Sequence, residues 1–103
     1  MVLCLSFLCS AASDLYAFTG YPVTLLCGVM GRHMADWAYQ ELENGTDQKI
    51  AEKGALIHDH SGRLTVDGRG LTITVVRASD AGIYICGHAS QLFHKVQLII
   101  SGL

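Results

Sequence analysis

One stretch near the end of this chain places four distinctive residues at alternate positions: Asp80, Gly82, Tyr84 and Cys86. Successive side chains of a β-strand point to opposite faces, so residues two apart share a face. The stretch therefore predicts a strand in which Tyr84 and Cys86 point into the same layer. Gly82 allows a tight start to that strand, and Asp80 lies in the turn before it. Cys86 then needs a partner on a facing layer, and Cys27 is the candidate.

The size and charge of the chain limit its class. Its 103 residues suffice for one domain, half of them are hydrophobic, and the net charge is -2. This composition predicts a packed core, and the absence of a basic field disfavours general nucleic-acid binding. The apolar run at 2–9 is shorter than the roughly 20 residues that a membrane-spanning helix needs.

Residues 1–12 resemble a secretory signal peptide followed by a domain at 13–103. The segment has an apolar run and then small residues, Ser10 and Ala12, spaced like a cleavage site, although it lacks the usual positive charge. An N-terminal strand is the alternative. Cleavage would remove Cys4 and Cys9 and leave two cysteines in an exported chain, which favours one Cys27–Cys86 disulfide.

Much of the remaining chain alternates between apolar and polar residues with a period of two, which indicates strands. The alternating stretches are 22–27, 36–42, 70–76, 82–86 and 95–100. In 70–76 the pattern places Leu71, Ile73 and Val75 inward. Turn signals separate the stretches, and Asn44-Gly45 predicts a short hairpin. Regular short strands with one cysteine pair predict an all-β, two-sheet sandwich with Greek-key connections and one disulfide between the sheets.

At this point the sequence resembles the immunoglobulin superfamily, over about Tyr16 to Ser101. The segment 62–86, GRLTVDGRGLTITVVRASDAGIYIC, is similar to three consecutive strands of a variable-type or intermediate-type domain. The matching residues are Cys27, Trp37, Leu71, Ile73, Asp80, Gly82, Tyr84 and Cys86. The resemblance implies that Trp37 packs on the disulfide and that the Tyr84 hydroxyl bonds to backbone. It also implies an ion pair between Arg63 and Asp80.

Two departures from the family pattern narrow the type of immunoglobulin domain that the chain resembles. The spacing between Cys27 and Cys86 is short for a variable-type domain, so we expect strand C″ to be short or absent. The last stretch, 94–103, lacks the F-G-x-G bulge of rearranged antigen receptors. The resemblance therefore implies a non-rearranging receptor or a cell-adhesion ectodomain, secreted or at the cell surface.

The outward side of three predicted strands is unusually apolar. A solvated sheet face should be polar, and apolar residues rimmed by polar ones mark interaction surfaces. The residues predicted to face outward are Ala38, Gln40, Leu42, Ile83, Ile85, Lys95, Gln97 and Ile99. In the family this sheet pairs with another domain, and Gln40 and Ile85 match positions used there. Scattered surface hydrophobes are the alternative reading.

The predicted loop at 87–94 adds possible anchors for a ligand. It carries His88 and Phe93, and exposed aromatic side chains on loops often anchor partners. Phe93 could equally fold back onto the edge of the sandwich. The Asn44-Gly45-Thr46 sequon makes Asn44 a candidate glycosylation site in an exported chain.

Catalysis has little support in the sequence. His58 and His60 could chelate zinc from one side of an extended segment, but a structural zinc site needs about four ligands, and we read them as polar loop residues. No nucleophile has a base at a recognised spacing. We therefore expect no enzyme, metal or cofactor. The expected function is extracellular protein recognition; the alternatives are a structural domain of a longer chain and a zinc-dependent hydrolase.

Overall fold

The computed structural model describes residues 13–27, 36–41, 45–57, 62–67, 70–88 and 91–102, with backbone only at 13, 88 and 91–93. The strands in this part of the chain are β1 (Ser13–Phe18), β2 (Val23–Leu26), β3 (Asp36–Gln40), β4 (Gln48–Glu52), β5 (Ala55–Leu56), β6 (Leu64–Val66), β7 (Gly70–Ile73), β8 (Gly82–His88) and β9 (Gln91–Ser101). A single 3₁₀ turn, η1 (Ala78–Asp80), precedes β8. No helix in these residues is long and apolar enough to cross a membrane.

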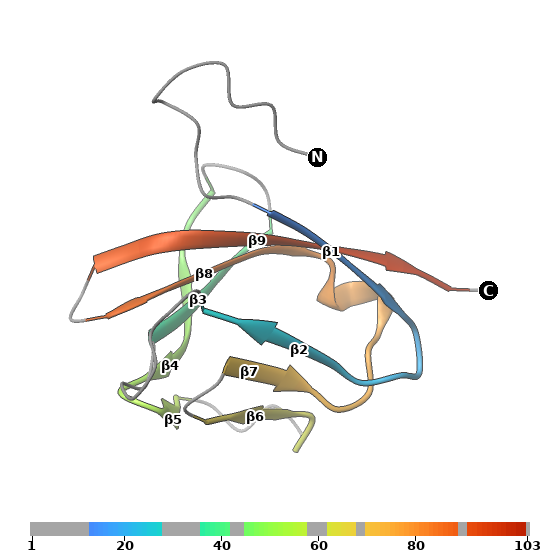
Figure 1. The fold of residues 1–103 in the computed structure, drawn as a ribbon, viewed down its shortest axis with the longest axis horizontal. Coiled ribbons are helices and arrows are strands. Elements are labelled where there is room, and N and C mark those ends of the chain that lie inside the picture. The colour runs from blue at the N-terminus through green and yellow to red at the C-terminus, as the bar shows by residue number, and fades with distance from the viewer. Residues whose placement is uncertain are drawn as a thin grey trace.

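The strands form two packed sheets, which confirms the predicted all-β sandwich. One sheet has six strands in the order β1-β9-β8-β3-β4-β5, and the other has three in the order β2-β7-β6 (Figure 1). The chain leaves the small sheet after β7, passes through η1 and enters β8 at the centre of the large sheet. The strand β1 runs parallel to β9, with Ser13 beside Val96 and Phe18 beside Ser101.

The core follows from the alternation of side chains in facing strands. Leu25, Leu71 and Ile73 of the small sheet are fully buried, and Trp37 and Leu98 of the large sheet are almost so. Burying one such aliphatic side chain is worth about 1.5–3 kcal/mol. These residues belong to one apolar cluster between the sheets, which is the main source of stability.

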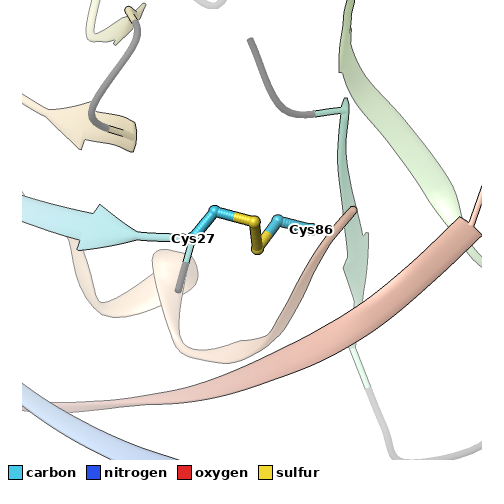
Figure 2. The surroundings of a disulfide bond; sticks show 2 residues. All are labelled: Cys27 and Cys86. Atoms are coloured by element: carbon cyan, nitrogen blue, oxygen red, sulfur yellow. A yellow bond between two sulfur atoms is a disulfide. The ribbon is translucent and has the colours of Figure 1, made fainter. Parts of the chain in front are cut away.

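A disulfide joins the two sheets, as the cysteine count predicts. Cys27 follows β2 in the small sheet and Cys86 lies in β8 of the large sheet, with their Cα atoms 5.9 Å apart (Figure 2). Both cysteines are buried within the apolar cluster that also contains Trp37. The bridge closes a loop of 59 positions, which stabilises the domain by about 4 kcal/mol in the chain-entropy model.

Several predicted strands have different bounds. The strand β7 ends at Ile73, because the Thr74 amide donates to the Arg63 carbonyl at 2.7 Å and the chain then turns. Val75 is consequently 47% exposed rather than inward, and Val76 takes the buried position. The strand equivalent to C″ is β5, which has two residues, so the expectation of a short strand is confirmed.

Two predicted connections are also wrong in length. Seven residues, 41–47, separate β3 from β4, which is longer than the short hairpin predicted from Asn44-Gly45, and Asn44 itself lies outside the described residues. The strands β8 and β9 extend into the stretch 87–94, for which the sequence predicts a loop, because their backbones continue to pair as far as His88 and Gln91. His88 and Phe93 therefore lie within strands, and their side chains are outside the described part of the structure.

Candidate protein-binding face

The six-stranded sheet has an outward side that we call the outer face. It carries alternate residues of four strands: Asp14, Tyr16 and Phe18 of β1, Ala38 and Gln40 of β3, Ile83 and Ile85 of β8, and Lys95, Gln97 and Ile99 of β9. Strand pairing arranges them in rows, and one row holds Ala38, Ile85 and Lys95. The next row holds Gln40, Ile83 and Gln97, and Ile99 lies beside Tyr16.

The centre of the outer face is buried, which differs from the expected exposed patch. Ala38 and Ile85 are only 2% and 4% exposed, and Ile83 is 9% exposed. They do not belong to the apolar cluster between the sheets. Each lies on a central strand with cross-strand neighbours on both sides, and the stems of long residues such as Lys95 can cover apolar surface. The outer face therefore has an apolar centre that is buried, with the polar residues Lys95 and Gln97 beside it in the strand rows.

Gln40 is the polar residue at the centre of the outer face. It is 7% exposed, and its Nε2 donates a hydrogen bond to Oδ1 of Asp47. Among the described residues its Oε1 has no donor, although the atom is buried. An unsatisfied buried polar atom costs about 1–3 kcal/mol, so this oxygen is a place where a donor would add stability.

The edge of the outer face at β1 is exposed, whereas its centre is buried. Tyr16 and Phe18 are 64% and 61% exposed, on a strand that ends the sheet. Our sequence reasoning missed these residues as part of the face. The available signal was the alternation of aromatic residues at 16 and 18, but nothing in it indicated that the strand pairs with β9.

The ion pair between Arg63 and Asp80 joins the residue before β6 to the 3₁₀ turn η1, and neither residue belongs to the outer face. Arg63 Nη1 and Nη2 donate to the Asp80 carboxylate at 2.9 and 3.1 Å, and the Arg77 amide donates to the same carboxylate at 2.8 Å. The hydrogen bond to Asp80 raises the pKa of Arg63 above its ordinary value. The carboxylate thus fixes the turn that leads into β8.

Two tyrosine hydroxyls hold the same turn. Tyr84 donates to the Asp80 carbonyl at 2.7 Å, and Tyr39 donates to the Ala81 carbonyl at 2.6 Å. Burial is the main cause that raises the pKa of both hydroxyls, and the negative charge of Asp80 adds to it. Gly82 follows with a φ of 148°, close against the Tyr39 ring. These residues form the strand corner that the resemblance implies, and their role is structural.

A hollow of about 540 Å³ opens beside this corner, between Lys49, Ile57, Leu64 and Tyr39. Its charged lining residues are Arg63 and Asp80, which pair with one another, and Lys49, which pairs with Glu52. In the described residues, no three histidine, cysteine or acidic side chains gather as metal ligands. The predicted candidates Leu42, Asn44, His58 and His60 lie outside the described residues.

Comparisons with known proteins bear on the fold. No family model matches the chain, and no curated protein matches it in sequence. Among solved structures, the chain is similar to the first immunoglobulin domain of mouse polymeric immunoglobulin receptor, with a TM-score of 0.68, 20% identity, and coverage of 87% of this chain and 90% of that one.

The chain is also similar to the first immunoglobulin domain of ZIG-8, crystallised as a homodimer. The TM-score is 0.67 with 16% identity, and the match covers 90% of this chain and 82% of that one. At these identities the similarity lies in the path of the backbone. Together with the two sheets and the Cys27–Cys86 bridge, it shows that this chain has the immunoglobulin fold.

Proposed function

We propose that this domain is an extracellular recognition module that pairs with another immunoglobulin-like domain through its outer face. The observation that carries the proposal is the apolar centre of that face. Ala38, Ile83 and Ile85 lie on the side of the sheet opposite the apolar cluster and are 2–9% exposed, so a partner would reach this centre through the accessible side chains around it, such as Gln97 and Ile99. Apolar residues with a polar rim are typical of protein interfaces.

Gln40 supports the same proposal. A partner that brings an amide donor to its Oε1 would satisfy a buried acceptor that has no donor among the described residues. The rim residues Lys95 and Gln97 would lie at the periphery of such an interface, where polar side chains set the choice of partner more than the affinity.

An extracellular location and a receptor or adhesion role complete the proposal. The Cys27–Cys86 bridge is the kind of bond that persists in oxidising compartments. One similar structure is a domain of a receptor and the other is a homodimer, which is consistent with pairing between like domains. The rival function is a spacer in a longer chain, in which the outer face contacts a neighbouring domain.

The test is the solution mass of the domain over a range of concentrations, by sedimentation equilibrium. We expect reversible self-association that Gln97→Arg and Ile99→Asp weaken, because both positions are accessible at the edge of the apolar centre. Ile85 is too buried to substitute with a charge without affecting folding. Thr65→Arg, on the exposed side of β6, is the matched control and should leave the dimer intact.

A monomer at every concentration would contradict pairing of this domain with itself and would favour the spacer role. A dimer that Thr65→Arg disrupts as strongly as Gln97→Arg would place the interface elsewhere.

A further inference from the structure

The strand β1 lies at the edge of the six-stranded sheet. One hydrogen bond shows which of its backbone NH and CO groups point toward β9 and which point away from it. The Thr19 amide donates to the Ser101 carbonyl at 3.0 Å, in register with the β1–β9 ladder. The backbone groups of successive residues point to opposite sides of a strand. The backbone amides of Leu15 and Ala17, like that of Thr19, therefore point toward β9. The amides of Tyr16 and Phe18 then point to the other side, where the described residues form no further strand.

The same two residues carry the exposed aromatic rings of the outer face. Tyr16 and Phe18 are 64% and 61% exposed. Natural edge strands are protected by lysine, proline or a bulge, since an unprotected edge is a template for another strand. The strand β1, with the sequence SDLYAF, has neither lysine nor proline, carries its one charge at Asp14 near its start, and pairs with β9 in unbroken register over six residues. Among the described residues its other edge has no strand partner, so it is available for strand addition.

We propose that the β1 edge is a second self-association site, at which β1 of one copy pairs antiparallel with β1 of another. An antiparallel pair of identical strands has two-fold symmetry, so one self-complementary edge suffices. The Phe18 carbonyl already accepts the Tyr21 amide at 3.2 Å, whereas both backbone groups of Tyr16 point to the open side. The pair is therefore centred on Tyr16, which exchanges two hydrogen bonds with Tyr16 of the second copy.

A second copy fits this edge better than a foreign segment does. Antiparallel pairing around Tyr16 places the two Tyr16 rings opposite one another and each Phe18 ring diagonal to them, all on the outer face. Aromatic cross-strand pairs stabilise sheets, and symmetry doubles every contact off the axis. The two large sheets then become one continuous sheet. This site uses the backbone edge of β1, whereas the pairing proposed for the apolar centre uses side chains of the outer face.

Hydrogen exchange of single amides tests the proposal without any substitution in β1. The experiment uses the Gln97→Arg variant, so that pairing through the apolar centre does not contribute. We expect the Tyr16 and Phe18 amides to exchange quickly in dilute protein and to become protected as concentration rises. Leu15 and Ala17 should be protected throughout, because β9 accepts their hydrogen bonds. Exchange of Tyr16 and Phe18 that does not depend on concentration would overturn the proposal.

A second test places a charge on the β1 edge and measures dimerisation. Tyr16→Lys, in the same background, should weaken dimerisation measured by sedimentation at least about tenfold, because it places two lysines opposite one another on the axis. Tyr21→Lys is the matched control: Tyr21 is 67% exposed but lies outside the strand. Circular dichroism checks that both variants fold. An unchanged dimer in Tyr16→Lys, or equal loss in both variants, would refute an edge centred on Tyr16.

Discussion

Removal of the Asp80 carboxylate gives a strong test of how the strand corner is held. The carboxylate accepts two hydrogen bonds from Arg63 and one from the Arg77 amide. The side chains of Arg63 and Asp80 are only 17% and 10% exposed. Asp80→Ala therefore leaves a guanidinium charge largely buried without its partner and an amide without its acceptor.

The expected loss can be estimated from these contacts. Breaking a buried ion pair by removing one partner typically costs 3–5 kcal/mol. The pair lines a hollow that opens to solvent, so water can partly hydrate Arg63, and we expect the lower end, about 3 kcal/mol. This is a large fraction of the 5–15 kcal/mol that stabilises a typical domain.

Urea unfolding followed by tryptophan fluorescence measures this loss, because Trp37 is the one tryptophan in the chain. Lys49→Ala is the matched control, since its pair with Glu52 is 70% and 53% exposed and should be worth less than about 1 kcal/mol. In a double-mutant cycle, Arg63→Ala should cost much less once Asp80 has been removed. Equal losses in Asp80→Ala and Lys49→Ala, or additive losses in the cycle, would refute the reasoning.

Three further predictions concern the residues around this corner. Trp37→Ala should lower the free energy of unfolding by about 3–5 kcal/mol, measured in urea, because the indole is 1% exposed within the apolar cluster. Gly82→Ala should cost about 1–3 kcal/mol in thermal unfolding, because φ is 148° and a Cβ would lie 2.6 Å from the Tyr39 ring; Gly20→Ala, with positive φ but open space, should cost less. The free energy of unfolding should fall as pH rises above about 10, because tyrosine ionises there in the unfolded chain while the raised pKa keeps Tyr84 neutral in the fold. Tyr84→Phe should weaken this pH dependence, and the same pH profile in the variant and the original domain would contradict the prediction.

Sequence reasoning recovers the fold well because its strongest signals are local. The period of two around Tyr84 and Cys86 predicts one strand and its inward face directly. The cysteine count then links that strand to Cys27 on the other sheet. Both signals depend on side-chain alternation and covalent chemistry, which a single sequence displays.

The sequence was less informative where several strands act together. It indicated which way Ile85 points, but burial of Ile85 depends on neighbours supplied by β3 and β9. It also gave no indication that β1 pairs with β9, because strand partners are chosen by tertiary packing. The exposed rings of Tyr16 and Phe18 were missed for that reason, and the strand end at Ile73 depends on a backbone bond to distant Arg63.

The parallel pairing of β1 with β9 has a mechanical consequence. When a load pulls the start of β1 and the end of β9 in opposite directions, the two strands slide along each other (Figure 1). All rungs between them bear the tension at once, whereas an antiparallel pair loaded at one end opens rung by rung. After those rungs rupture, the Cys27–Cys86 bridge still withholds about 200 Å of polypeptide from stretching. Under such a load the disulfide therefore limits how far the domain can extend.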